Sequence, residues 1–219
     1  MTVPEGFPRR AEIIAVGSEL LTPFRTDSNS LFITARLNEI GIDVGAKFVV
    51  ADDESELSSF VTAALGRASL VVLTGGLGPT ADDVTREAVS VALGVPLEEE
   101  PSIVEAIRAR FASRGLEMPS LNLRQALVLR GASILANPNG TAPGQWFARG
   151  GRYVLLLPGP PHEMRPMLEK VLADRLAPLA TTRVVRRVLR IAGRPESSVD
   201  QAAQPVYSRW TGWDPAVST

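Results

Sequence analysis

The sequence predicts an α/β fold with three layers (α/β/α), in which helices cover both faces of a mostly parallel sheet, followed by the start of a small α+β second domain. Short apolar runs alternate with amphipathic stretches from residue 11 onward, as is typical of strands joined by crossover helices. Glycine, proline or acidic residues punctuate the boundaries. With 219 residues, 45% of them hydrophobic, the chain can bury a sizeable core.

The expected elements follow one another in regular order. Strands are expected at residues 11–17, 43–51, 70–76 and 153–159, where apolar side chains predominate. Helices are expected at residues 28–41, 54–68, 82–94, 98–115 and 162–178. Gly41, Gly94 and Gly115 close three of these helices, a position that glycine commonly takes.

The pattern changes near residue 180. Residues 184–207 begin with alternating charged and apolar side chains, which favours a half-exposed strand followed by a short helix. We therefore predict a first domain at residues 1–179 and the incomplete beginning of a second domain at residues 180–219.

Composition excludes several classes of function. The 23 Lys and Arg residues nearly balance the 24 Asp and Glu residues, so we expect no direct binding of nucleic acid. The absence of cysteine excludes disulfides, thiolate metal sites and cysteine nucleophiles. We expect a cytoplasmic protein that does not associate with a membrane, because no apolar run approaches the ~18 residues of a membrane span or resembles a signal peptide.

The main candidate for a functional site is the stretch of residues 73–86, LTGGLGPTADDVTR, which joins the expected strand at residues 70–76 to the expected helix at residues 82–94. Gly76, Gly78 and Ala81 match the dinucleotide-binding pattern G-x-G-x-x-A, but the match alone is weak. In that motif the helix N-terminus receives a pyrophosphate, whereas Asp82 and Asp83 would repel the anion here.

Two interpretations of the aspartates remain open. In the first, Thr80 and Asp83 form a capping arrangement at the helix start, worth about 1 kcal/mol. In the second, one carboxylate binds a hard cation such as Mg²⁺, which neutralises a diphosphate held by backbone amides of the glycine loop. The local sequence favours neither.

Other turns are expected to converge on the same edge of the sheet, because ligands of open parallel sheets bind outside the carboxyl ends of the strands. Gly17, Ser18 and Glu19 follow the first strand, Asp52 and Asp53 the second, and Gly159 the last. Each turn alone is ordinary turn chemistry, but together they favour one binding crevice.

Two further stretches are weaker candidates. Residues 137–144, NPNGTAPG, contain small residues that permit close approach to a ligand, although a plain surface loop is the favoured interpretation. Arg124 and Gln125 could contact phosphate or ribose, or simply be solvated. His162, the only histidine, is not adopted as a general base.

Together the stretches AEIIAVGSELL, GGLGPTADDVTREAV, NLRQAL, NPNGTAPG and LLPGPPHEM resemble the N-terminal domain of the CinA family of competence/damage-inducible proteins. That domain is similar in fold to the molybdopterin-binding domain of MoaB and MogA. The matching stretches extend from Ala11 to about Pro178 in the family's order, and the tail from Val184 looks like the start of the family's small middle domain. The C-terminal amidase domain of many members is absent from these residues.

The resemblance implies metal-dependent hydrolysis of the diphosphate of ADP-ribose, or of a related nucleotide diphosphate, to AMP and ribose 5-phosphate. By motif, the acids that matter for phosphate and metal handling fall on Asp52 and Asp83, with Asp82 beside it. We expect a divalent metal ion (Mg²⁺, Mn²⁺ or Co²⁺) at Asp83, Asp82 and Asp52, with Glu19 as a further catalytic carboxylate. The family also suggests a homodimer.

The ligand is expected to contact small and polar residues of the turns after the first, third and last strands and of the 137–144 stretch, together with Asn29. These are Gly17, Ser18, Asn29, Gly75, Gly76, Gly78, Thr80, Asn139, Gly140, Thr141, Gly144 and Gly159. The alternative is a non-catalytic module that binds a nucleotide or pterin, or a regulatory protein related to competence or DNA damage. A binding module would keep the glycine loops without needing the acids.

Overall fold

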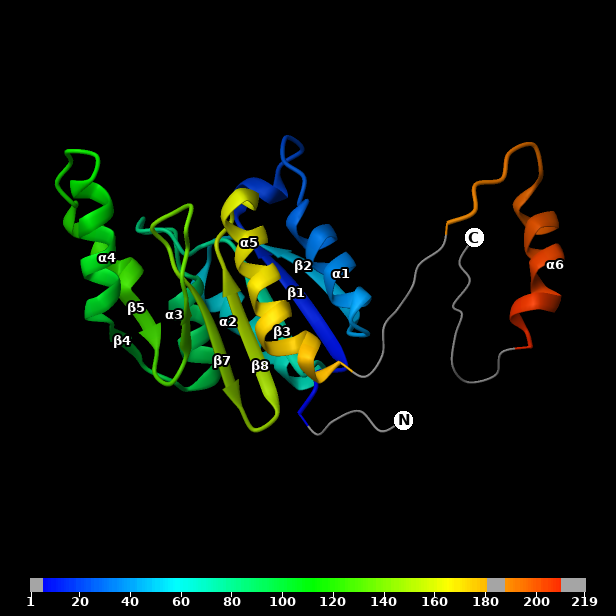
Figure 1. The fold of residues 1–219 in the computed structure, drawn as a ribbon, viewed down its shortest axis with the longest axis horizontal. Coiled ribbons are helices and arrows are strands. Elements are labelled where there is room, and N and C mark those ends of the chain that lie inside the picture. Colours follow the sequence, from blue (N-terminus) through cyan, green and yellow to red (C-terminus); the bar gives the residue numbers. More distant parts are fainter. Residues whose placement is uncertain (1–5, 181–187, 210–219) are drawn as a thin grey trace. The chain divides into compact units, whose positions relative to one another are not determined.

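The computed structural model describes residues 6–180 and 188–209. The chain divides into two compact units, residues 1–184 and 185–219, and each is described by itself. Figure 1 shows the ribbon of the first unit, a sheet with helices in front of it and behind it. The predicted domain boundary near residue 180 stays a prediction.

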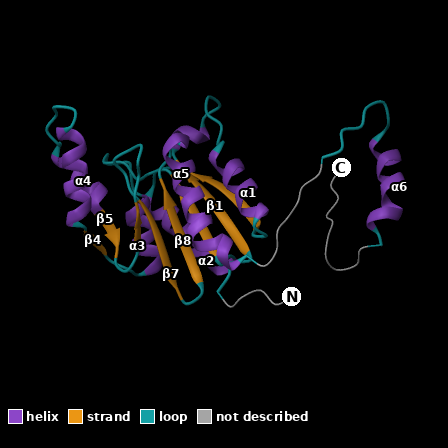
Figure 2. Ribbon diagram, viewed as in Figure 1, coloured by secondary structure: helices purple, strands orange, loops and turns teal. Residues whose placement is uncertain are grey.

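The main sheet contains six strands in the order β2-β1-β3-β8-β7-β6 (Figure 2). β1, β2, β3 and β8 run parallel to one another, whereas β7 and β6 continue the sheet in antiparallel fashion. The strands are β1 (Arg10–Val16), β2 (Asp43–Val50), β3 (Leu70–Thr74), β6 (Ser133–Leu135), β7 (Gly144–Arg149) and β8 (Arg152–Leu157). The predicted parallel part is confirmed.

Helices cover both faces of this sheet, which confirms the predicted α/β/α layers. α1 (Asn29–Glu39) and α5 (Pro161–Val171) pack on one face, while α2 (Glu54–Arg67) and α3 (Thr85–Leu93) pack on the other. Successive side chains of β1 point to opposite faces of the sheet. Ile13 packs in the core on the side of α1 and α5, and Ile14 packs in the core on the side of α2 and α3. Burial on both faces explains why the central strands are apolar runs.

α3 begins three residues later than expected, at Thr85 rather than at Asp82. Residues 80–82 form a turn in which the Asp83 carboxylate holds the amide and hydroxyl of Thr80, so the glycine loop extends further before the helix starts. The last expected helix is also divided: α5 ends at Val171, and a π-helical turn (Leu172–Leu176) and a 3₁₀ turn (Ala177–Leu179) follow it.

A small lobe between α3 and β6 was only partly anticipated. β4 (Leu97–Glu99) pairs with β5 (Leu127–Leu129), and α4 (Pro101–Ala112) and the 3₁₀ segment η2 (Ser120–Ala126) lie between them in sequence. Residues 98–99 therefore belong to a strand, and the expected helix starts at Pro101, where a proline fits the first helical turn.

The second unit contains α6 (Glu196–Tyr207), the short helix that the sequence predicts. Residues 188–195 form no strand, so this part of the expected half-exposed strand is wrong, while residues 184–187 lie outside the described residues. α6 buries none of its side chains, and a strand needs a partner to satisfy its backbone. Among the described helices, none has the length and apolar character needed to cross a bilayer.

Candidate functional site

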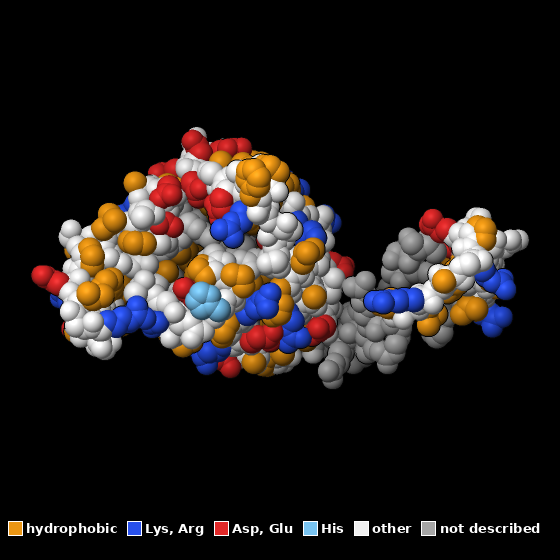
Figure 3. All heavy atoms as spheres, turned by 90° about the horizontal axis from the view of Figure 1, so that it is seen from above, with side chains coloured by type: hydrophobic (Ala, Val, Ile, Leu, Met, Phe, Trp, Pro, Cys, Tyr) orange, Lys and Arg blue, Asp and Glu red, His pale blue; other side chains and the backbone are white. Residues whose placement is uncertain are grey.

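A cavity of about 320 Å³ opens at the carboxyl edge of the parallel strands. The turns after β1, β2, β3 and β8 all contribute to its lining, as the sequence predicts. Viewed from above the sheet, acidic side chains gather around a hollow in the surface (Figure 3). Five carboxylates line this cavity, which we call the edge pocket: Glu19, Asp52, Asp82, Asp83 and Glu163. No basic side chain of the described residues joins them.

The glycine loop after β3 is shaped by close backbone packing. Gly75 has φ of +104°, and a Cβ there would lie 2.2 Å from the carbonyl oxygen of Val16. A Cβ on Gly76 would lie 2.2 Å from Oγ1 of Thr85, whose hydroxyl donates to the Gly75 carbonyl at 2.9 Å. Glycine is therefore required at both positions by geometry inside the protein, whatever ligand the loop binds.

Asp83 closes the same loop. Its Oδ1 accepts from the amide of Gly78 at 2.7 Å, and its Oδ2 accepts from the amide of Thr80 at 2.9 Å and from the Thr80 hydroxyl. The structure thus contains the capping arrangement of Thr80 and Asp83 that was one of the two interpretations, although it holds a loop rather than the first turn of a helix. The assignment of Asp83 to a metal stays a prediction.

Asp82 lies beside Asp83 but is exposed to solvent. The Thr80 hydroxyl is the main group that lowers the pKa of Asp82, and the Asp82 amide and the charge of Arg124 act in the same direction. In the structure the single proton of this hydroxyl is donated to Oδ2 of Asp83. Asp82 is consequently an anion at neutral pH on the rim of the edge pocket.

The turns after β1 and β2 are joined by reciprocal hydrogen bonds. The amide of Ser18 donates to Oδ2 of Asp52 at 2.7 Å, and the amide of Asp52 donates to Oγ of Ser18 at 3.1 Å. Only Oδ2 of Asp52 accepts a hydrogen bond from the described residues, and Asp52 is part of the lining of the edge pocket. The neighbouring Asp53 caps α2 by accepting from the Glu56 amide at 2.7 Å, so its role is structural.

Asn29 connects the first residue of α1 with two strand ends. Its Nδ2 donates to Oγ1 of Thr74 at 3.0 Å and to the carbonyl of Gly159 at 2.7 Å. The side chain is buried and does not belong to the edge pocket's lining. Asn29 therefore holds the loops after β3 and β8 together, which differs from the direct ligand contact that the sequence suggested.

The loop at residues 137–144 is organised by Asn137. Its Oδ1 accepts from the amides of Asn139 and Gly140, and its Nδ2 donates to the carbonyl of Ala142 and to Oε2 of Glu163. Only the end of this loop reaches the edge pocket, through Thr141 and Ala142.

The structure brings ten of the predicted site residues into the lining of the edge pocket. They are Gly17, Glu19, Asp52, Gly75, Gly76, Gly78, Asp82, Asp83, Thr141 and Gly159. The others lie outside this lining, namely Ser18, Asn29, Thr80, Asn139, Gly140 and Gly144. For Gly144 the reason is packing in β7, because a Cβ would lie 2.6 Å from the carbonyl oxygen of Leu156.

The sequence did not identify Arg86, which supports the glycine loop from within the protein. Its side chain is 1% exposed, and its guanidinium donates to the carbonyls of Leu77 at 2.7 Å and Gly78 at 2.8 Å. Burial lowers the pKa of Arg86, but arginine titrates so far above neutrality that it stays charged. Arg86 lies one helical turn before the apolar Val89, on the same face of α3. This spacing is the sequence feature that could have indicated that Arg86 is buried.

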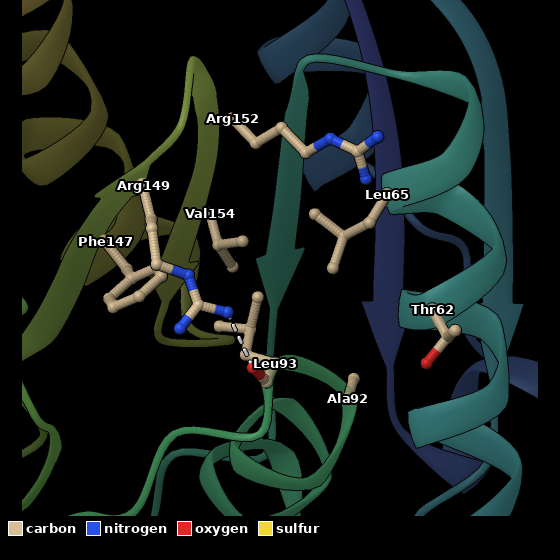
Figure 4. Close-up of a pocket in the computed structure, with 8 residues that line it drawn as sticks. All are labelled: Thr62, Leu65, Ala92, Leu93, Phe147, Arg149, Arg152 and Val154. Atoms are coloured by element: carbon tan, nitrogen blue, oxygen red, sulfur yellow. Dashed lines mark hydrogen bonds between the residues drawn. The ribbon is translucent and has the colours of Figure 1, made fainter.

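A second cavity, of about 210 Å³, lies away from the strand-end loops (Figure 4). It is lined by apolar side chains of α2, α3 and β8 and by Arg149 and Arg152 at the β7–β8 hairpin. Arg149 donates to the carbonyl of Leu93 at 2.8 Å, the interaction drawn in the figure. None of the motifs singled out in the sequence reaches this cavity.

Fold and site together define an α/β/α protein with an acidic pocket at the carboxyl edge of its sheet. The family described as "Probable molybdopterin binding domain" matches residues 12–178. A CinA-like protein of Solibacter usitatus (strain Ellin6076) is 47% identical over 201 residues, which cover 91% of this chain and 48% of the relative. The chain belongs to the molybdopterin-binding-domain family, as a CinA-like member.

Solved structures agree with this assignment. The crystal structure of the protein CinA with unknown function from Thermoplasma acidophilum matches with a TM-score of 0.71 and 35% identity, covering 76% of this chain and 97% of that one. A molybdopterin biosynthesis protein from Mycobacterium abscessus shares the fold alone, with a TM-score of 0.51 and 24% identity over 78% of this chain and 93% of that one. The chain spans about half the length of the curated relatives it matches.

Proposed function

We propose that the edge pocket binds a phosphate-bearing nucleotide or pterin together with a divalent cation. The observation that carries this proposal is the composition of the lining, which combines five carboxylates with glycine-loop backbone and includes no basic side chain among the described residues. A bare diphosphate would be repelled by such a lining, whereas a diphosphate that brings a cation would be attracted.

The donors suit a hard cation such as Mg²⁺, because they are all oxygen atoms. The carboxylates of Glu19 and Asp82 and the second oxygen of Asp52 would hold it, since both oxygens of Asp83 already accept hydrogen bonds within the loop. No group of three or more acidic or histidine side chains in the described residues is arranged as a metal cluster. Mg²⁺ commonly takes only one or two protein carboxylates and completes its shell with water and phosphate oxygens.

Backbone amides would hold the phosphate oxygens. In the part of the chain that the structure describes, the amides of Gly76, Thr141 and Gly159 donate to no protein acceptor, and all three residues line the edge pocket. Backbone amides in such turns form concave anion sites. The family description, which names molybdopterin, makes a pterin a candidate for the rest of the ligand beside a nucleotide.

Hydrolysis of the ligand's diphosphate, with ADP-ribose as the test substrate, is the second candidate. It is favoured by the five carboxylates of the lining, which exceed the one or two that a magnesium ion commonly takes from a protein. Water would attack one phosphorus, the bond from that phosphorus to the bridging oxygen would break, and a lining carboxylate that does not hold the cation would accept a proton from the water. A bound cation would supply charge neutralisation.

Binding and hydrolysis are separated by one set of measurements. Calorimetric titration with ADP-ribose in Mg²⁺ or in EDTA tests the pocket, and release of AMP under the same conditions tests the chemistry. We expect tight binding only with the cation. Binding that is equally strong in EDTA would contradict the proposed role of the cation, and no binding in Mg²⁺, Mn²⁺ or Co²⁺ would contradict the proposal for this ligand.

Asp52→Asn and Asp53→Asn form a matched pair for this test. The two residues are neighbours, but only Asp52 lines the edge pocket, while Asp53 caps α2. We expect Asp52→Asn to weaken cation-dependent binding and Asp53→Asn to leave it unchanged. Equal losses in both variants would indicate a structural effect of the turn.

A further inference from the structure

Gln125 is a buried polar residue of the small lobe that reaches the edge pocket. It is 2% exposed, yet it is part of the pocket lining. Its Oε1 accepts from Nδ2 of Asn122 at 2.9 Å, which fixes the orientation of the amide group. Among the described residues, no acceptor takes the Nε2 hydrogens of Gln125.

A buried amide that is bonded through its oxygen alone presents donors only. The Nε2 atom of Gln125 is not among the fully buried side-chain atoms that lack a partner, so it is reached from the edge pocket, where a ligand or water can accept from it. Toward the pocket, Gln125 therefore selects for a hydrogen-bond acceptor. The phosphates are expected elsewhere, at the backbone of the loops after β3 and β8, so the acceptor would belong to another part of the ligand.

Arg124, the residue before Gln125, connects the small lobe to the glycine loop and to α3. Its guanidinium donates to Oε1 of Glu87 at 2.8 Å, to the carbonyl of Asp83 at 3.3 Å and to the carbonyl of Thr80. These contacts attach η2 to the end of the glycine loop and to α3. Arg124 is therefore a positioning residue, and the lobe holds Gln125 at a set place relative to the loop.

We propose that Gln125 is a specificity residue that donates a hydrogen bond from Nε2 to the heterocycle or sugar of the bound ligand. This inference rests on the proposed function, because it assumes that the phosphates of the same ligand occupy the glycine loop. Purines and pterins carry ring nitrogen or carbonyl acceptors, and ribose carries hydroxyl acceptors. Inorganic pyrophosphate carries none of these groups and serves as the comparison ligand.

The test compares two ligands on the full chain in Mg²⁺. Calorimetric titrations with ADP-ribose and with inorganic pyrophosphate are carried out on the wild type, Gln125→Met and Gln125→Leu. Both substitutions remove the donor without adding a charge to the acidic lining, and Gln125→Met keeps the approximate length of the side chain. For ADP-ribose we expect an affinity about tenfold lower in both variants, the size of one lost hydrogen bond. Pyrophosphate affinity is expected to stay unchanged.

Each other outcome has a distinct meaning. If pyrophosphate and ADP-ribose lose affinity equally, Gln125 acts on the shape of the loop, and the inference is overturned. It is also overturned if neither affinity changes, or if the wild type binds ADP-ribose no tighter than pyrophosphate. If the wild type binds neither ligand, the proposed function itself fails, and the inference falls with it. Thermal unfolding of both variants shows whether the fold is kept.

Discussion

The carboxylate of Asp83 accepts a hydrogen bond from the backbone amide of Gly78, and the 2.7 Å distance is that of a strong, charge-assisted interaction. The same side chain also holds the amide and hydroxyl of Thr80, so one residue joins two positions of the loop. This relationship makes Asp83 a determinant of the shape of the glycine loop.

Replacing Asp83 with alanine should destabilise the protein by about 2 kcal/mol, because several hydrogen bonds to a charged acceptor are lost. Asp82→Ala is the matched control, since it removes the adjacent, exposed carboxylate, and it should leave the free energy of unfolding nearly unchanged. Urea denaturation followed by circular dichroism measures both values. Equal stability of the two variants would show that the loop does not depend on Asp83.

Gly75→Ala and Gly159→Ala should separate folding from binding. A Cβ on Gly75 would lie 2.2 Å from the Val16 carbonyl at a φ of +104°, so we expect a loss of about 2 kcal/mol or more. At Gly159 the nearest atom is 3.5 Å away, an ordinary contact, and the fold should tolerate alanine. Because Gly159 lines the edge pocket, Gly159→Ala should still weaken ligand binding. Thermal unfolding and calorimetric titration distinguish the two effects, and a stable Gly75→Ala variant would contradict this account.

The elements of the sheet that the sequence predicted correctly share one property, which is burial on both faces. β1, β3 and β8 are apolar runs because each packs against helices on either side. β7 was missed because its sequence, GQWFAR, includes the polar Gln145. Gln145 is buried because its amide bonds to the backbone of Leu127 and Leu129, a long-range contact that no local pattern reveals.

The candidate site was predictable in its location but less so in the roles of its residues. Parallel topology brings strand ends together, so the order of strands and turns along the chain was enough to assign Gly17, Asp52 and Gly159 to one edge. Capping and cation binding require the same carboxylate chemistry, so sequence alone could not decide what Asp83 does. Arg86 was missed because a charged helix residue is ordinarily solvated.

Asp82 should titrate below the ordinary range of an aspartate, because the Thr80 hydroxyl is the main group that lowers its pKa. A depressed carboxylate pKa contributes stability that is fully present above the unfolded pKa, about 3.9, and is lost as the pH falls through the folded value; for the exposed Asp82, screening by solvent keeps this contribution small. Thr80→Ala should raise the pKa of Asp82 toward 3.8, the ordinary value. Carboxyl ¹³C NMR titration measures this shift. An unchanged Asp82 titration in Thr80→Ala would exclude the hydroxyl as its cause.

Arg86 should be one of the most sensitive positions of the protein outside the apolar core. Its guanidinium, 1% exposed, bonds the carbonyls of Leu77 and Gly78 at 2.7 and 2.8 Å. Arg86→Met leaves both carbonyls without this partner, which should cost about 2 kcal/mol or more, partly offset because a charge no longer has to be buried. Arg86→Lys should recover only part of this loss, because a single ammonium lacks the planar fork that spans two acceptors.

The matched control for Arg86 is Arg152→Ala. Arg152 is exposed at the second cavity, away from the edge pocket, so its loss should change stability by no more than about 0.5 kcal/mol. Urea denaturation gives the free energy of unfolding of all three variants, and titration with ADP-ribose in Mg²⁺ gives the affinity. Since Arg86 fixes the carbonyls of the loop that is expected to hold the phosphates, affinity should fall in Arg86→Lys even under conditions where that variant is fully folded. A folded Arg86→Lys variant with unchanged affinity would mean that the loop keeps its shape without the guanidinium, and that Arg86 contributes to stability alone.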